Sequence, residues 1–254
     1  MKAIYKISIL VLCMLTLVAC EDDFLNEEPK SFLSPEVTYR TDAGLVSGAV
    51  GLYDEFSYPF YSHTRFLGFW AITNGATDFN VQGSARRNNE IHQLTSEFNG
   101  ATADEDLTDT WAHWYRLVNN ATILLDFSAD HAWENDALRS RTEGEAHFFR
   151  AWGHFYLTML WGDVPMIQSS IKGVKVDFTR DSQSAVLDFV IQDFTSAMDK
   201  LPADPDQPGR ITKGTAMHML AYAYLAKEDY PNAETWAQAL IDDPKYSLVT
   251  SRVG

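Results

Sequence analysis

The sequence predicts an all-α protein of stacked helix pairs, with one long irregular insertion between the first two helices. Apolar residues recur every three or four positions in six segments of the chain, which is the spacing of amphipathic helices rather than of strands. Residues 59–103 show no such period. Loops longer than about 12 to 15 residues in compact domains tend to be functional or disordered. The insertion is therefore the first place to look for a ligand site.

The composition of the chain fits a folded, acidic protein. Of its 254 residues, 46% are hydrophobic and 13% are aromatic, which is enough to bury a sizeable core in one or two domains. The 35 acidic residues outnumber the 20 Lys and Arg residues, so the net charge is −15. Such a charge opposes electrostatic binding to nucleic acid or to an anionic membrane surface. We therefore expect no nucleic-acid partner.

Residues 1–19 have the features of a secretory signal peptide. Lys2 and Lys6 precede an apolar run, Ile7–Ala19, that is shorter than the roughly 20 residues a membrane-spanning helix needs. The run ends in Leu17-Val18-Ala19-Cys20, which resembles the lipobox of bacterial lipoproteins. This resemblance implies that the peptide is cut before Cys20 and that Cys20 carries the lipid. The alternative is a plain signal peptide followed by an ordinary buried cysteine.

Cleavage and lipidation at the lipobox would leave the mature protein without a free thiol. If the lipobox holds, Cys13 leaves with the signal peptide and lipid blocks Cys20, and the chain has no third cysteine. Disulfides and cysteine-ligated zinc sites are therefore not expected.

An acidic tether is expected over residues 20–35. It begins with Glu21-Asp22-Asp23 and contains Pro29 and Pro35. An acidic cluster directly after the lipidated cysteine resembles the surface-export signal of Bacteroidetes lipoproteins. A solvated linker without any targeting role is the alternative.

Four helices are expected in the first part of the helical domain, each with an apolar stripe. They span about 42–58, 104–127, 135–160 and 180–201. The third is apolar over most of its circumference from Ala146 onward, so other elements must cover it on more than one side. It is expected to end at Gly162, which can adopt a left-handed conformation, and Pro165 prevents its continuation. The stretch 202–209 is rich in proline and can form no regular element.

The last two helices form a pair that resembles one tetratricopeptide (TPR) unit. They span Lys213–Ala226 and Pro231–Ile241. Both contain several alanines, which allow two helix backbones to approach closely, and Pro244 closes a unit whose TPR period is about 34 residues. The Trp and Leu-Gly positions of the TPR signature are not cleanly matched. We expect TPR-like pairs at 139–201 and 213–244, stacked as an α-superhelix, or α–α solenoid.

The insertion combines aromatic rings with hydrogen-bonding side chains. Its aromatic residues, which disordered segments usually lack, are interleaved with polar and charged residues. Aromatic faces stack on the apolar faces of sugar rings, while amide, carboxylate and guanidinium groups bind hydroxyl groups. This mixture suits glycan binding, although a peptide site would use a similar one. The alternative for most of these rings is to pack the insertion against the helices.

No catalytic or metal-binding motif stands out. The sequence contains no G-x-S-x-G, H-E-x-x-H or G-x-x-x-x-G-K-[ST] motif. Glu143, His147 and His154 share one face of the third helix and could suggest a metal site. Side chains that pair with Arg150 and with neighbouring turns are the simpler interpretation. We expect no enzyme activity, no cofactor and no metal.

Taken together, these features resemble the SusD/RagB family. The most specific match is EGEAHFFRAWGHFYLTMLWGDVPMI, residues 143–167, with the pattern E-A-x-F-x-R-A at Glu145–Ala151 and a W-G-D-V-P turn at Trp161–Pro165. Shorter matches lie along the rest of the chain, at Trp111, Tyr115, Asn119-Asn120, Leu201-Pro202, Gly209–Lys213 and Tyr246-Ser247-Leu248. The resemblance extends over nearly all of the chain that follows the signal peptide.

The resemblance implies a lipoprotein that is anchored to the outer membrane, faces the cell exterior and catalyses nothing. Members of the family bind oligosaccharides, or peptides in some RagB-type members, and deliver them to a TonB-dependent transporter of the SusC type. Their fold is a TPR-like α-superhelix with an irregular part that contributes much of the ligand site. Here this fold corresponds to a helical domain over 36–254. A TPR-like scaffold that binds the transporter and no small ligand is the alternative.

The resemblance also implies where a ligand would bind. The N-terminal half of family members contributes ligand contacts from the region that corresponds here to Arg65–Asp78. We therefore nominate Arg65, Trp70, Asn74 and Asp78, with Trp70 stacking on a sugar ring and the others binding its hydroxyl groups. Family members are much longer than this chain. We expect it to correspond to their N-terminal half, either as a fragment or as a protein with a partial site.

Overall fold

The computed structural model describes residues 34–61 and 104–247. The predicted signal peptide, most of the tether and nearly all of the insertion lie outside these ranges. Residues up to Thr38 form one unit, of which the structure describes the single-turn helix α2 (Pro35–Thr38). The amides of Val37 and Thr38 both donate to the Ser34 carbonyl, which closes this turn. A second unit begins at Tyr39 and contains all the other described helices.

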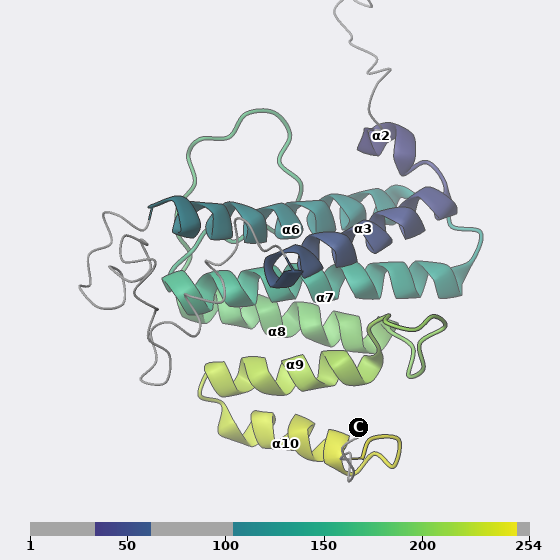
Figure 1. Cartoon of the computed structure of the whole chain (residues 1–254), viewed down its shortest axis with the longest axis vertical. Helices are drawn as coiled ribbons and strands as arrows, with labels where there is room; N and C mark the ends of the chain where they lie inside the picture. The colour runs from purple at the N-terminus through teal and green to yellow at the C-terminus, as the bar shows by residue number, and fades with distance from the viewer. Residues whose placement is uncertain (1–33, 62–103, 248–254) are drawn as a thin grey trace, which may run out of the picture. The chain divides into compact units, whose positions relative to one another are not determined.

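The second unit is a stack of antiparallel helices. Its described helices are α3 (Asp42–Tyr61), α6 (Asp104–Asp130), α7 (Asp136–Trp161), α8 (Gln183–Lys200), α9 (Lys213–Ala226) and α10 (Tyr230–Ile241). Helices α6 to α10 follow one another side by side through the stack, and α3 lies across α6 and α7 (Figure 1). Within the described ranges, the only β-type pairing is an isolated bridge between Val164 and Asp181. The predicted all-α class and its TPR-like superhelix are confirmed.

The helix ends have identifiable local causes. Asn135 caps α7, because its side-chain oxygen accepts hydrogen bonds from the amides of Ala137 and Leu138 at 2.9 and 3.1 Å. The same helix ends at Gly162, as predicted, with a φ of +72° that favours glycine. The Gly162 amide donates to the Thr158 carbonyl at 2.9 Å, so the last turn keeps its hydrogen bond.

Three boundaries differ from the sequence prediction by three residues: the start of α8, the end of α3, and the end of α6, which lies at Asp130 instead of Phe127. Helix α8 begins at Gln183, because the backbone of Asp181 is extended and exchanges two hydrogen bonds with Val164, at 3.0 and 3.1 Å. Helix α3 continues to Tyr61 instead of ending near Tyr58. The rings of Phe56 and Phe60 lie one turn apart with centroids at 5.5 Å, and such a pair stabilises the end of a helix.

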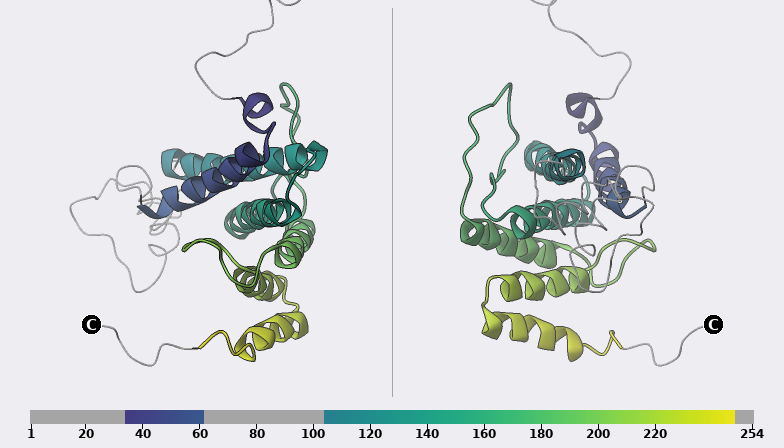
Figure 2. Two further views of the ribbon diagram at one scale, coloured as in Figure 1. Left: turned by 90° about the vertical axis from the view of Figure 1, so that its right-hand side faces the viewer. Right: turned by 60° about the vertical axis from the view of Figure 1, so that its left-hand side comes forward.

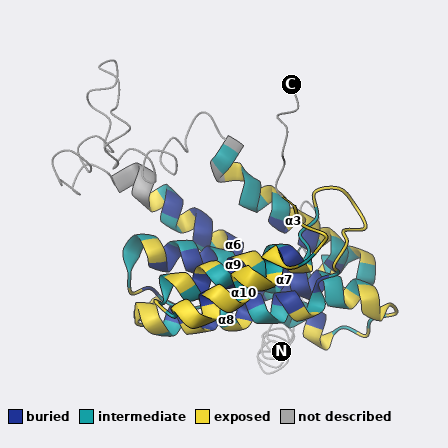
Figure 3. Ribbon diagram, turned by 90° about the horizontal axis from the view of Figure 1, so that it is seen from below, coloured by how far each residue is buried: buried dark blue, intermediate teal, exposed yellow. Residues whose placement is uncertain are grey.

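Helix α7 lies at the centre of the core, as its apolar circumference predicts. It contacts α3, α6 and α8, and both Phe148 and Phe149 are buried. Helix α6 approaches α7 closely at Gly153, where a Cβ atom would lie 2.6 Å from a methyl group of Val118. At the other end of the stack, α10 is mostly exposed (Figure 3), and Ala233 is its one buried residue. The helices are therefore packed most tightly around α7.

The loop between α7 and α8 leaves the stack. Residues 171–180 are all exposed, and Val174 and Val176 are 95% and 88% accessible. The loop rises beside α6 in all three views (Figures 1 and 2). None of the described helices combines the length and the apolar character needed to cross a lipid bilayer.

Candidate ligand-binding site

The nominated site residues lie outside the described residues. This applies to Arg65, Trp70, Asn74 and Asp78 in the insertion and to Cys20 at the predicted lipid site. Their roles therefore stay predictions from the sequence. The structure does show the helix that precedes the insertion and the surface that this helix shares with α7.

An aromatic hollow runs along α3 and α7, directly before the insertion. It has a volume of about 900 Å³ and is lined mainly by aromatic rings. We call it the α3 hollow; its residues are Val50, Tyr53, Asp54, Phe56, Ser57, Phe60, Trp152 and Tyr156. The Phe56 ring meets the Trp152 ring edge-on, with centroids 5.0 Å apart, and Trp152 lies 5.4 Å from Tyr156. The Ser57 hydroxyl and the Asp54 carboxylate lie beside these rings. Such a surface suits a ligand that has both apolar faces and hydroxyl groups.

A buried ion pair fixes the tyrosine of this hollow. The Tyr53 hydroxyl donates to a Glu145 carboxylate oxygen at 2.9 Å, and Arg210 donates to both oxygens of Glu145 at 3.0 and 2.8 Å. The Ile211 amide in turn donates to the Tyr53 hydroxyl at 3.1 Å. Burial raises the pKa of Glu145, although its hydrogen bonds with Tyr53 and Arg210 act in the opposite direction. These contacts join α3, α7 and the segment before α9, so the α3 hollow has a rigid base.

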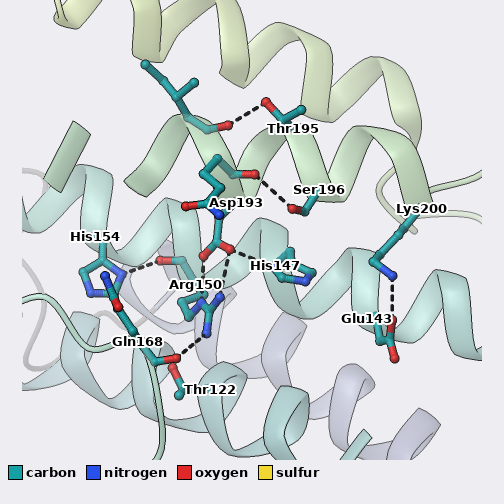
Figure 4. Close-up of polar contacts among 12 residues, drawn as sticks. Thr122, Glu143, His147, Arg150, His154, Gln168, Asp193, Thr195, Ser196 and Lys200 are labelled. Atoms are coloured by element: carbon teal, nitrogen blue, oxygen red, sulfur yellow. Dashed lines mark hydrogen bonds and ion pairs between the residues drawn. The ribbon is translucent and has the colours of Figure 1, made fainter. Parts of the chain in front are cut away.

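A second buried network fixes the start of the α7–α8 loop (Figure 4). Arg150 donates to both oxygens of Asp193 at 2.7 and 2.9 Å and to the Gln168 carbonyl at 3.0 Å. His147 lies 2.7 Å from Asp193. Burial raises the pKa of Asp193, but the hydrogen bonds from Arg150 and His147 outweigh it and lower the pKa overall. The ionised carboxylate thus orients the arginine that anchors the loop.

His154 also holds the start of the α7–α8 loop, through the backbone amide of Ile167. Its Nδ1 lies 3.0 Å from the Arg150 carbonyl, and its Nε2 lies 3.0 Å from the Ile167 amide nitrogen. Because an amide can only donate, Nε2 accepts and Nδ1–H donates, which identifies the neutral tautomer. The histidine is fully buried.

Glu143, His147 and His154 on α7 pair with neighbouring residues, as expected from the sequence in preference to a metal site. Glu143 binds Arg139 at 2.8 Å and Lys200 at 2.7 Å rather than Arg150, while His147 and His154 have the partners given above. Burial raises the pKa of Glu143, but hydrogen bonds from Lys200, Arg139 and Ser128 lower it overall. Among the described residues, no three His, Cys, Asp or Glu side chains are grouped as metal ligands.

His154 is expected to make the fold sensitive to mild acid. Complete burial lowers the pKa of His154 to about 4, from an ordinary value of 6.5. Between these values the unfolded chain binds a proton that the folded protein does not, so the free energy of unfolding falls as the pH falls. Between pH 7 and pH 5, His154 should lower the free energy of unfolding by about 2 kcal/mol. This pH range lies above the ordinary pKa of carboxyl groups in an unfolded chain, so those groups contribute little to the change.

Urea unfolding at several pH values would measure this effect. In the His154→Gln variant the slope between pH 7 and pH 5 should be smaller than in the wild type, because the amide does not titrate. The matched control is His218→Gln, at an exposed imidazole on α9, which should keep the wild-type slope. Equal slopes for all three proteins would show that His154 does not cause the acid sensitivity.

A profile of one protein family matches most of this chain. The family is SusD-like, described as starch-binding and associating with the outer membrane, and the match covers residues 23–227. SusD-like protein P2 of Formosa agariphila is 26% identical to the chain over 242 residues. The matched part is 94% of this chain but 46% of that protein, so the chain spans about half the length of this relative.

Solved structures share the fold. A laminarin-binding SusD-like protein superposes with a TM-score of 0.71 at 21% identity, over 82% of this chain and 45% of its own. A protein crystallised with a xylogluco-oligosaccharide superposes with a TM-score of 0.67 at 22% identity, over 82% of this chain and 42% of its own. The helical fold and the family profile thus agree with the resemblance found in residues 143–167, and the chain belongs to the SusD-like family.

Proposed function

We propose that the protein is a cell-surface lipoprotein that captures oligosaccharides and hands them to a SusC-like TonB-dependent transporter in the outer membrane. The observation that carries this proposal is the family match over residues 23–227. Two proteins that share its fold, one described as laminarin-binding and one crystallised with a xylogluco-oligosaccharide, support a glycan as the ligand. The protein acts by binding and release, without catalysis.

The N-terminal segments supply the membrane anchor in this proposal. Residues 1–19 direct export, Cys20 receives the lipid, and residues 20–35 form the acidic tether that directs the protein to the cell exterior. The helical domain over 36–254 then binds the ligand, with its TPR-like pairs at 139–201 and 213–244 as the scaffold. An anchored, tethered domain can meet glycans outside the cell and still stay close to a transporter in the same membrane.

The ligand site in this proposal combines the insertion with the α3 hollow. Trp70 stacks on a sugar ring, and Arg65, Asn74 and Asp78 bind its hydroxyl groups. The α3 hollow supports the assignment because it offers exposed ring surface next to Ser57 and Asp54 in the turns that precede the insertion. Its tyrosine is held by Glu145, so the hollow does not have to be ordered when the ligand binds.

Electrophoresis in gels that contain a polysaccharide would test the proposal. The purified protein should be retarded by at least one of starch, laminarin and xyloglucan. Trp70→Ala should abolish most of that retardation, because the stacking of a sugar on one aromatic ring supplies a large share of such binding. The matched control is Tyr230→Ala, at a 60% exposed ring on α10, which should migrate as the wild type.

Two results would overturn parts of the proposal. Unchanged retardation of Trp70→Ala would remove Trp70 from the site. No retardation in any polymer, together with capture of a SusC-like transporter by the same protein, would favour the scaffold function instead. Release of reducing ends from the polymer would indicate an enzyme.

A further inference from the structure

A second pocket lies between α6 and the α7–α8 loop and shares no lining residue with the α3 hollow. It has a volume of about 350 Å³, within the range of about 300–1,000 Å³ that is usual for small-molecule sites. We call it the loop pocket. Its main residues are Trp111, Tyr115 and Asn119 on α6 and Ile167, Ile171 and Phe178 on the loop.

The helix side of the loop pocket is a fixed pair of aromatic rings. The Trp111 and Tyr115 centroids are 4.9 Å apart, and Trp111 meets the Trp161 ring edge-on at 5.2 Å. The Tyr115 hydroxyl donates to the Pro165 carbonyl at 2.7 Å. Burial raises the pKa of Tyr115, so this donor stays protonated. Both rings are half-buried and present part of their surface to the pocket.

The loop side of the pocket is held by groups that do not line it. Besides the bonds from Arg150 and His154, the Met166 amide donates to Asp181 at 2.9 Å and the Ser170 amide donates to Asp126 at 2.7 Å. Ile167 and Ile171, which lie between or next to these anchored residues, line the pocket. A pocket with such support exists before a ligand arrives, which lowers the cost of binding.

One polar side chain in the pocket is free to bind a ligand. The Asn119 side chain makes no hydrogen bond to the described residues, and its amide offers two donors and an acceptor. A hollow of about 730 Å³ adjoins the pocket through Ile167, Ile171 and Phe178, and it adds polar residues such as Ser169 and Lys172. The site is thus apolar on its ring side and polar along Asn119 and the adjoining hollow.

This division matches the two kinds of surface on a pyranose ring. The C–H face of a sugar can pack on Trp111, Tyr115 and Phe178, while its hydroxyl groups reach Asn119 and the polar hollow. A purely apolar side chain from a partner protein would fill the ring side but leave the Asn119 amide covered without a partner, which is costly. A sugar therefore fits better than an apolar protein contact.

We propose that the loop pocket is a further sugar-binding subsite of this protein, built from other residues than the α3 hollow and the nominated insertion residues. The inference rests on the proposed glycan-binding function and adds a second place where the same polymer is held. Two subsites on one chain would raise the retention of a long polysaccharide more than that of a short oligosaccharide, because the second contact forms without a new encounter.

The test compares pocket variants with a matched control on the same loop. Asn119→Leu removes the free amide and Phe178→Ala removes a ring, whereas Val176→Ala alters an 88% exposed residue that lines neither hollow. In gels that contain starch, laminarin or xyloglucan, both pocket variants should bind the retarding polymer on the order of 3- to 10-fold more weakly than the wild type. Val176→Ala should bind as the wild type does.

The outcomes separate this inference from the proposed function. Retardation of the wild type with no change in Asn119→Leu or Phe178→Ala overturns the subsite and leaves the glycan-binding function standing. No retardation of the wild type in any of the three polymers overturns both. If the pocket variants lose binding to a SusC-like transporter but keep their retardation, the pocket is a protein contact and not a sugar site.

A second measurement keeps the inference testable if a variant folds poorly. The side-chain amide of Asn119 gives a pair of NMR signals that sequence-specific assignment of the wild-type spectrum identifies without any variant. Adding an oligosaccharide of the retarding polymer to the wild type should shift these two signals. Signals that stay in place at saturating oligosaccharide would overturn the subsite.

Discussion

Replacing Arg210 with alanine is expected to lower the free energy of unfolding by about 3–5 kcal/mol, the usual cost of removing one partner of a buried ion pair. The Arg210 and Glu145 side chains are only 10% and 1% exposed. Without the guanidinium group, the carboxylate keeps one hydrogen bond from Tyr53 and loses both bonds from Arg210. The uncompensated charge in the core is the physical reason for the large effect. Urea unfolding followed by circular dichroism would measure it.

The control for Arg210→Ala is an exposed ion pair. Lys245 pairs with Asp204, whose side chain is 82% exposed, so Lys245→Ala should cost about 0–1 kcal/mol. A double variant, Arg210→Met with Glu145→Leu, should recover much of the loss, because no charge then remains buried. If Arg210→Ala costs no more than Lys245→Ala, the ion pair does not stabilise α7 against α3 and the segment before α9.

The helices of this protein could be predicted because their signals are local. Apolar spacing, the cap at Asn135 and the glycine at Gly162 all act within one or two turns, and the ends of α7 and α9 agree with prediction to within one residue. The start of α8 was predicted three residues early. Its position depends on the bridge between Val164 and Asp181, which joins two backbone segments that no periodic pattern links.

The contacts that build the candidate site could not be predicted in the same way, because they join residues far apart in the chain. Glu145 lies 65 residues from Arg210 and 92 from Tyr53. The sequence marked Glu145–Ala151 and Gly209–Lys213 as matches to the family but gave no reason for them. The fold supplies that reason, since the two motifs meet in one ion pair.

The residues of the loop pocket could not be predicted from the sequence either. Trp111, Tyr115 and Asn119 follow one another at four-residue steps on α6, a spacing that also fits an ordinary core stripe. Only the position of the α7–α8 loop leaves these side chains beside a cavity. The sequence singled out a different set, Arg65, Trp70, Asn74 and Asp78, from the family resemblance, and that set stays a prediction.

Replacing Asp193 with alanine is the second change with a large expected effect, again about 3–5 kcal/mol in the free energy of unfolding. Asp193 is the shared partner of Arg150 and His147, and its side chain is 3% exposed while that of Arg150 is 8% exposed. Removing the carboxylate leaves the arginine charge buried with only the Gln168 carbonyl to bind. The start of the α7–α8 loop should loosen as well, because Arg150 is no longer oriented toward it.

Helix α8 offers a matched control for this variant in Asp188→Ala. Asp188 pairs with Lys227 but is 60% exposed, so its loss should cost about 0–1 kcal/mol. Asp193→Asn should fall between the two, since the amide keeps the shape and one acceptor but not the charge. Urea unfolding would rank the three variants by stability. A loss of polysaccharide binding in Asp193→Asn, with an unchanged far-UV circular dichroism spectrum, would show that the position of the α7–α8 loop depends on this carboxylate. If Asp193→Ala and Asp188→Ala unfold alike, the buried network does not stabilise α7 against α8, and the rigidity of the loop pocket must come from His154, Asp126 and Asp181 instead.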